Sequence, residues 1–227
     1  MTGDPLGLIE TMYADGAGIR FLARHLHRLA ASAETLGLVC PVEEVETALR
    51  AAAVGLVAPR RIRLQLDPDG AFHVTGAALP PPPAGMPAVV VASQRVSADD
   101  VLLRHKTTRR AVYDAARAAL PGDGSVLDAL LLNQDGEVCE GAITNVFALS
   151  GGRLLTPPAA CGLLPGIMRG HVIEAYGARE AVLRPADLAQ AERLFLTNAV
   201  RGMIEVRLAP GPWEAPGGAG HGSAAGT

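Results

Sequence analysis

The chain has 227 residues, a formal net charge of −3 and 49% hydrophobic residues. This length fits one large or two small domains with a sizeable core, and so weak a charge gives no reason to expect nucleic acid or an anionic membrane as a partner. No apolar run could span a bilayer, the N-terminus lacks the basic start of a signal peptide, and the three cysteines are too widely spaced for a disulfide framework or a metal site. We therefore expect a cytoplasmic protein without a metal.

The first part of the chain predicts a small α/β domain over residues 1–97. Hydrophobic periodicity and turn residues indicate five elements: strands at 6–13 and 88–96, helices at 21–38 and 41–56, and a hairpin at 61–79. The first helix is expected to end near Gly37, and the hairpin to turn at Asp69-Gly70.

The second part predicts a β-rich domain over residues 98–210, entered through a linker at about 97–105. Its expected elements are a helix at 109–120, a meander at 126–157, a helix entered near Gly166, and a strand, short helix, strand, turn and strand over 181–208. Residues 211–227 are rich in Gly, Pro and Ala and predict a flexible tail. These patterns alone describe a two-part α+β protein with an enzyme-like organisation.

Four stretches carry residues with chemical potential: LLRHKTTRRAVY around Lys106, NQDGEVCEGAITNVFAL around Glu140, GLLPGIMR, and LTNAVRG. Each is a weak signal by itself. A lysine between a strand and a helix is usually exposed, and so is a glutamate on a strand. A glycine-proline loop that opens a helix can bind phosphate through free backbone N–H groups, but many loops look like it.

Together, in this order, the four stretches resemble the signature of the class IV aminotransferase family, the fold-type IV pyridoxal phosphate (PLP) enzymes. The likeness extends from about Leu8 to Val206 and is greatest to the aminodeoxychorismate lyases, especially the lyase domain fused to aminodeoxychorismate synthase, through LIETM, RHLHRLAASA, RHKTTRR, EGAITNVF, CGLLPGIMR and NAVRG. The resemblance implies a small N-terminal α/β domain, a larger C-terminal β-rich pseudo-barrel domain, PLP as cofactor, a homodimer, and the synthase as a functional partner.

The resemblance also assigns roles at the cofactor. Lys106 would form the internal Schiff base and later carry a proton, Glu140 would keep the pyridine nitrogen protonated, and Arg28 would bind the phosphate. Arg28 lies about 200° around its helix from Leu26, a position compatible with that role. Asn145 is expected to shape its strand, hold a loop or contact the cofactor. Further phosphate contacts, mainly through backbone, are expected at Gly166, Ile167, Met168, Asn198, Ala199 and Val200, because Met168 and Ala199 stand where aminotransferases often carry threonine.

The implied reaction converts 4-amino-4-deoxychorismate to 4-aminobenzoate and pyruvate. Candidates for holding the two substrate carboxylates are Arg109, Arg110 and Arg201. Thr11 is a third candidate catalytic residue: related aminotransferases tend to carry Gly or Val there, whereas lyases carry a Thr facing the cofactor, and a hydroxyl can position a proton. Packing in a strand would also explain Thr11.

Several assignments stay open at this stage. Tyr113 is interpreted as a core residue, and the histidines at 25, 27 and 105 as surface residues or residues behind the site. One alternative function is a class IV aminotransferase acting on branched-chain or D-amino acids. The other is a catalytically silent homologue that serves as a binding module, against which the presence of both Lys106 and Glu140 counts.

Overall fold

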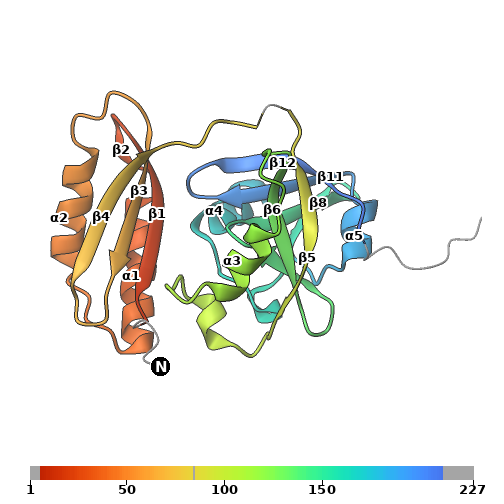
Figure 1. Ribbon diagram of the computed structural model, residues 1–227, viewed down its shortest axis with the longest axis horizontal. Helices are drawn as coiled ribbons and strands as arrows, with labels where there is room; N and C mark the ends of the chain where they lie inside the picture. Colours follow the sequence, from red (N-terminus) through yellow and green to blue (C-terminus); the bar gives the residue numbers. More distant parts are fainter. Residues whose placement is uncertain (1–5, 84, 212–227) are drawn as a thin grey trace, which may run out of the picture.

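The computed structural model describes residues 6–83 and 85–211, so nearly all of the tail predicted at 211–227 lies outside the described residues. The chain forms two units side by side, each built on its own sheet (Figure 1). This arrangement, a small α/β unit beside a larger unit with a curled mixed sheet, confirms the predicted α+β fold class. Within the described part, no helix has the length and apolarity needed to cross a membrane.

The small unit is a four-stranded sheet with two helices. Its strands run in the order β2-β1-β3-β4, and the elements are β1 (Leu8–Asp15), β2 (Gly18–Ile19), α1 (Leu22–Leu36), α2 (Val42–Ala53), β3 (Arg60–Leu66) and β4 (Phe72–Ala78). Helix α2 lies on the side of the sheet turned away from the large unit (Figure 1). The predicted helix end at Gly37 is confirmed by its left-handed φ of 68°, and the hairpin turn by the φ of 92° at Gly70.

Strand alternation gives the small sheet two different faces, because successive side chains on a strand point to opposite sides. Leu8 and Met12 pair in register with Leu66 and Ile62, and all four are buried in the core against the helices. The alternate residues Ile9 and Thr11 belong to the opposite face. This second face looks toward the large unit and supplies part of the site.

The large unit is an eight-stranded mixed sheet in the order β10-β9-β8-β11-β12-β5-β6-β7. Its elements are β5 (Ala88–Val96), η1 (Val101–Arg104), α3 (Ala111–Ala118), β6 (Val126–Asn133), β7 (Val138–Gly141), β8 (Asn145–Ser150), β9 (Arg153–Thr156), η2 (Ala159–Cys161), α4 (Ile167–Tyr176), β10 (Arg179–Glu180), α5 (Pro185–Gln190), β11 (Arg193–Asn198) and β12 (Gly202–Leu208). The predicted meander and the helix entered at Gly166 are both present.

Two boundaries differ from the sequence-based expectation. The strand at 88–96, assigned to the first domain, is β5 of the large sheet, where it runs parallel to β6 and β12. The crossing between the units therefore lies at 79–87, where four consecutive prolines cannot take part in a sheet ladder, and not at residue 97. The strand expected at 181–184 is replaced by the two-residue β10, because the chain turns into α5 at Pro185.

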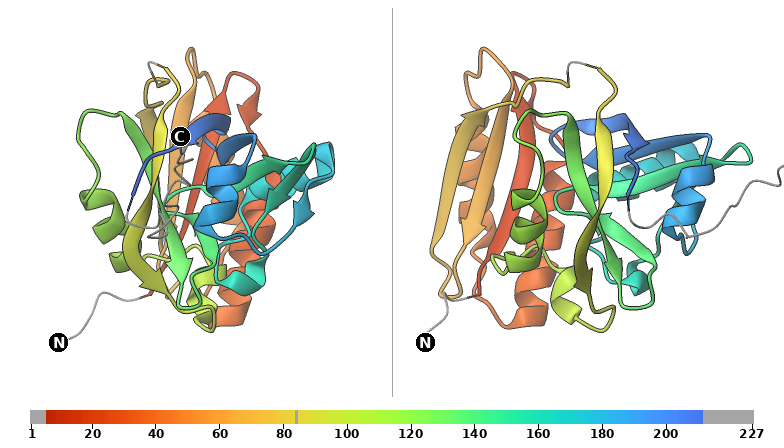
Figure 2. Two further views of the ribbon diagram at one scale, coloured as in Figure 1. Left: turned by 90° about the vertical axis from the view of Figure 1, so that its right-hand side faces the viewer. Right: turned by 45° about the vertical axis from the view of Figure 1, so that its right-hand side comes forward.

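The segment of the large unit between β5 and α3 carries Lys106 and contacts the small unit. It lies between the two sheets in the right-hand view of Figure 2. The backbone N–H of Ile9 donates to the Lys106 carbonyl at 2.7 Å, and that of Thr108 donates to the Gly7 carbonyl at 2.9 Å. These bonds pair a short stretch of the second unit antiparallel to the start of β1, which fixes the backbone of Lys106 against the small sheet.

Candidate active site

A cavity of about 450 Å³ lies between the two units. Strands β1 and β3 and helix α1 line it from the small unit. The Lys106 segment, β7, the start of α4 and the turn between β11 and β12 line it from the large unit. It contains every site residue predicted from the sequence: Thr11, Arg28, Lys106, Arg109, Arg110, Glu140, Asn145, Gly166, Ile167, Met168, Asn198, Ala199, Val200 and Arg201. Residues separated by up to 190 positions therefore converge on one space.

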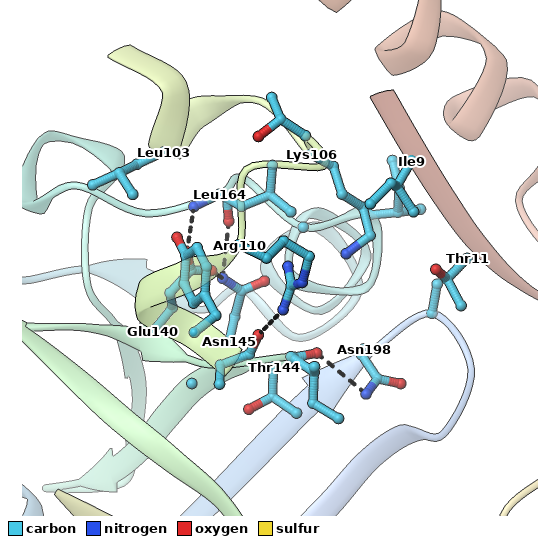
Figure 3. Close-up of a pocket in the computed structure, with 18 of the residues that line it drawn as sticks. Ile9, Thr11, Leu103, Lys106, Arg110, Glu140, Thr144, Asn145, Leu164 and Asn198 are labelled. Atoms are coloured by element: carbon cyan, nitrogen blue, oxygen red, sulfur yellow. Dashed lines mark hydrogen bonds between the residues drawn. The ribbon is translucent and has the colours of Figure 1, made fainter. Parts of the chain in front are cut away.

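The Lys106 side chain extends into this cavity, with its amine in the space between Arg110 and Thr11 (Figure 3). Burial, together with the charges of Arg28 and Arg110, lowers the pKa of Lys106 from 10.5 to about 8, against the opposing effect of Glu10 and Glu140. A lower pKa increases the fraction of neutral amine near neutral pH. The neutral amine is the form that can attack a carbonyl or accept a proton.

Glu140 is a buried carboxylate at the other end of the cavity, with 6% of its surface exposed. Its Oε1 accepts a hydrogen bond from the Leu164 backbone N–H at 3.1 Å, beside Asn145, whose Nδ2 donates to Oε2 at 3.3 Å (Figure 3). The Tyr113 hydroxyl also donates to Oε1, at 2.9 Å. Burial raises the pKa of Glu140 to about 7, although the bonds from Leu164 and Tyr113 oppose this rise. Such a carboxylate is poised to hold a proton or a cationic N–H group.

Asn145 holds a loop in place. Its amide nitrogen also donates to the Leu164 carbonyl at 2.9 Å. On its other side it approaches the backbone at Gly166 so closely that a Cβ there would lie 2.1 Å from Asn145 Oδ1. Glycine at 166 is thus required for the loop to pass this side chain. This agrees with the loop-holding interpretation of Asn145, and a direct contact with a cofactor stays a prediction.

The structure gives Tyr113 a role that the sequence interpretation missed. It is buried like a core residue, but its hydroxyl reaches Glu140, and the Arg110 guanidinium lies over its ring at 4.9 Å from the ring centre. The signal available in the sequence was the spacing of Arg110 and Tyr113, three residues apart on one helix face. That spacing cannot reveal Glu140 as the partner, because Glu140 belongs to β7, which is 27 residues away in the chain and follows the whole of β6.

Groups suited to an anion gather at one end of the cavity. Gly166 is the N-cap of α4, and the first backbone N–H groups of a helix have no partner within the helix. The hydroxyl of Thr197 is buried there and makes no hydrogen bond with any described residue. The turn after β11 offers fewer free N–H groups for an anion than expected. The backbone N–H of Val200, which was predicted to donate to the phosphate, donates instead to Asn198 Oδ1 at 3.1 Å.

Arginines surround the remaining wall of the cavity. The predicted Arg110 donates to the Ala142 carbonyl at 2.7 Å, and Arg201 donates to the Pro81 carbonyl at 3.1 Å. Two more, Arg61 and Arg63 on β3, were not predicted. Arg63 pairs in register with Thr11, so both side chains lie on the face of the small sheet turned toward the cavity. The alternation in β3 could have shown that Arg61 and Arg63 share a face, but not which side the large unit covers.

Comparison with known proteins identifies the family. Residues 7–209 match the amino-transferase class IV family. A candidate aminodeoxychorismate lyase from Schizosaccharomyces pombe is 31% identical over 200 residues, which cover 86% of each chain. A candidate branched-chain-amino-acid aminotransferase from Thermotoga maritima is 29% identical over 81% of this chain and 70% of its own length. The crystal structure of a candidate amino-acid aminotransferase from Mesorhizobium loti superposes with a TM-score of 0.84 at 37% identity, covering 90% of this chain and 100% of the other.

The chain belongs to the class IV aminotransferase family. Members of this family are PLP-dependent enzymes, and the names of the relatives include both lyases and aminotransferases. The residues present here fit that cofactor. Lys106 would offer an amine of lowered pKa to its aldehyde, Glu140 would offer a carboxylate to its ring nitrogen, and Arg28 with the start of α4 would offer donors to its phosphate.

The bond from Tyr113 to Glu140 can be tested by Tyr113→Phe, which removes only the hydroxyl. We expect the pKa of Glu140 to rise further, because the charged carboxylate loses a donor, and turnover to fall about tenfold through the loss of one charge-assisted hydrogen bond. The acidic limb of the pH–rate profile should move to higher pH. A control is Tyr176→Phe, an exposed tyrosine at the end of α4. An unchanged profile in Tyr113→Phe would show that Tyr113 only fills the core.

Proposed function

We propose that this class IV enzyme is an aminodeoxychorismate lyase, which converts 4-amino-4-deoxychorismate to 4-aminobenzoate and pyruvate. The observation that carries the proposal is the set of arginines facing the cavity besides the phosphate candidate Arg28: Arg61, Arg63, Arg109, Arg110 and Arg201. The proposed substrate has two carboxylates, and guanidinium groups are the donors best suited to them. A branched-chain amino acid has one carboxylate and an apolar side chain, for which such a wall is poorly suited.

The high local density of positive charge supports this substrate class. Burial and the charges of Arg110 and Arg61 lower the pKa of Arg63. These cations repel one another in the empty cavity, so a dianion placed among them would relieve the repulsion as well as form new bonds. The S. pombe relative, which matches over nearly its whole length, adds support because its name assigns it as a candidate lyase.

Each residue has a definite task in the proposed reaction. Bound PLP would supply an electron sink for the carbanion. Lys106 Nζ would remove the proton from the amine-bearing carbon of the substrate, and the Glu140 carboxylate would accept a hydrogen bond from the protonated ring nitrogen of the cofactor. The carbon–oxygen bond of the enolpyruvyl ether then breaks, the six-membered ring becomes aromatic, and the leaving enolate takes up a proton to become pyruvate. The arginines hold the two carboxylates throughout.

The test is to supply 4-amino-4-deoxychorismate, generated in situ from chorismate and glutamine by a purified synthase, to the PLP-loaded protein. We expect 4-aminobenzoate and pyruvate in equal amounts, measured by chromatography and by a lactate dehydrogenase assay. Failure to form 4-aminobenzoate, with keto acids released from branched-chain or D-amino acids, would instead establish the aminotransferase. Absence of both activities in protein that binds PLP would establish a binding module.

Arg63→Gln tests the arginine wall directly. Loss of one charged donor to a substrate carboxylate should raise KM for aminodeoxychorismate by about tenfold or more, with a smaller change in kcat. Arg60→Gln is the matched control: Arg60 lies three positions earlier on the same strand and outside the cavity lining. Equal kinetics in the two variants would remove Arg63 from substrate binding.

Thr11→Val tests the distinction between lyase and aminotransferase. If the Thr11 hydroxyl positions the proton for the departing pyruvyl group, the variant should lose most 4-aminobenzoate formation yet bind PLP normally. A residual half-reaction with a D-amino acid should be slowed much less, because it needs no such proton. Thr75→Val is a control, since Thr75 lies in the same row of the sheet as Thr11 and Arg63 but outside the cavity lining. Equal loss in both reactions, or none, would leave Thr11 a packing residue.

A further inference from the structure

The small unit buries a carboxylate that the proposed reaction does not use. Glu10 follows Ile9 on β1, and its side chain lies on the face covered by α1, where neighbouring positions carry the apolar core. Only 2% of its surface is exposed. A buried charge is costly unless it is paired, so the partners of Glu10 indicate why it is there.

Two residues of α1 satisfy both oxygens of Glu10. Arg28 Nε donates to Oε1 at 2.8 Å and Arg28 NH2 donates to Oε2 at 2.7 Å, in the paired geometry of a bidentate ion pair. His25 Nδ1 lies 2.6 Å from Oε2 and completes the carboxylate's coordination. Burial would raise the pKa of Glu10, but the Arg28 charge and the bonds from His25 and Arg28 outweigh it and hold the pKa at about 2. Glu10 is therefore ionised throughout the physiological range.

His25 is more deeply buried than a helix surface residue would be, with 1% exposed. Its Nε2 has no hydrogen-bond partner among the described residues. An unpaired buried nitrogen destabilises the fold. Within the described part of the chain, the only polar contact of this ring is with Glu10, which indicates that His25 supports that carboxylate.

The ion pair with Glu10 determines the orientation of the Arg28 guanidinium at the cavity wall. A guanidinium has five N–H groups, of which Glu10 engages two, and this fixes the plane of the group. Arg28 remains 13% exposed and lines the same cavity as Lys106. Its remaining N–H groups are thus presented in one orientation, without the loss of side-chain entropy that a free arginine would suffer on binding an anion.

We propose that Glu10, supported by His25, is a positioning residue that holds Arg28 in the orientation required to bind the phosphate group of PLP. The inference rests on PLP being the cofactor and deepens the proposed function by explaining how the phosphate end of the site is organised before the cofactor arrives. The proposal places the role of Glu10 at the phosphate end of the site, and its charge acts on the aldehyde end only by opposing the larger effects of burial, Arg28 and Arg110 on the pKa of Lys106.

Pyridoxal provides the decisive comparison, because it has the same ring and aldehyde as PLP but no phosphate. Titration of the apoprotein, followed by absorbance, gives the Kd of each compound. In Glu10→Gln we expect PLP to bind at least about tenfold more weakly, because an amide NH₂ replaces an accepting oxygen and Arg28 loses its fixed orientation. The Kd for pyridoxal should change by less than about twofold, because it makes no phosphate contact. Inorganic phosphate should also compete less effectively with PLP in this variant.

Glu174→Gln is a matched control. Glu174 forms a bidentate pair with Arg24, one turn before Arg28 on the same helix, but both partners are exposed. It should leave both affinities unchanged. His25→Asn keeps a donor near the position of Nδ1, whereas His25→Leu removes it, so PLP affinity should fall in the leucine variant and be largely retained in the asparagine variant. Thermal melting establishes that each apoprotein is folded, and the His25 pair carries the test if Glu10→Gln does not fold.

The outcomes separate this inference from the proposed function. Equal weakening of PLP and pyridoxal in Glu10→Gln, or unchanged PLP affinity in both Glu10→Gln and His25→Leu, would overturn it by showing that the network only supports the fold. Neither result bears on whether the wild-type enzyme forms 4-aminobenzoate. Conversely, a loss selective for PLP would uphold the positioning role even in a protein found to be an aminotransferase.

Discussion

Lys106→Ala is expected to abolish both 4-aminobenzoate formation and covalent capture of PLP. Lys106 is the only lysine in the chain, so no neighbouring side-chain amine can replace it. Borohydride reduction of the PLP-loaded wild type, followed by peptide mass spectrometry, should place the cofactor on the peptide that contains Lys106. A reducible adduct that persists in the variant would contradict the assignment and point to the N-terminal amine.

The lowered pKa of Lys106 makes this capture depend on pH. Only the neutral amine attacks the aldehyde, and its fraction rises about tenfold for each pH unit below the pKa. With the pKa at about 8, the capture rate should rise steeply up to about pH 8 and then level off. A rate that continues to rise toward pH 10.5, the ordinary pKa of lysine, would show that burial and the neighbouring arginines do not act on this amine.

Glu140→Gln should leave the fold and much of the PLP binding intact but remove most of the activity. A neutral amide cannot hold a proton on the ring nitrogen as a carboxylate does, and we expect the barrier to rise by about 2–4 kcal/mol, the scale of one preorganised electrostatic partner. Steady-state kinetics should show the loss mainly in kcat.

Glu192→Gln serves as the control for Glu140→Gln, because Glu192 is an exposed carboxylate of the same unit. It should behave as wild type. A wild-type rate in Glu140→Gln would remove Glu140 from the site, and loss of the folded state would be visible in the melting curve. The Tyr113→Phe variant should also lower the activity, but by a smaller amount, because it destabilises the ionised carboxylate of Glu140 without removing it.

The sequence by itself determined the local features of this protein. The repeat of apolar residues over 21–38 is sufficient to predict α1, and Asp69-Gly70 is sufficient to predict the hairpin, because helix period and turn geometry depend on residues close together in the chain. The roles of Lys106 and Glu140 are predicted only through the resemblance of the four stretches taken together, because each stretch is a weak signal by itself. The ordered set of such stretches pointed to the family that residues 7–209 match.

Only the tertiary structure decided which distant side chains meet. The position of β5 depends on pairing with β6 and β12, and the place of Arg63 at the cavity depends on which face of the small sheet the large unit covers. Neither position can be inferred from local periodicity, because the alternation of side chains along a strand indicates two faces but not which part of the protein packs against each face.

The partners of the buried carboxylates show the same limit. Tyr113 reaches Glu140 across 27 residues, and Glu10 meets Arg28 across 18. In each case a polar residue looks like an ordinary member of a strand or helix until packing removes it from water. Burial then makes its hydrogen-bond partner energetically decisive, and burial is a property of the assembled fold and not of any one segment.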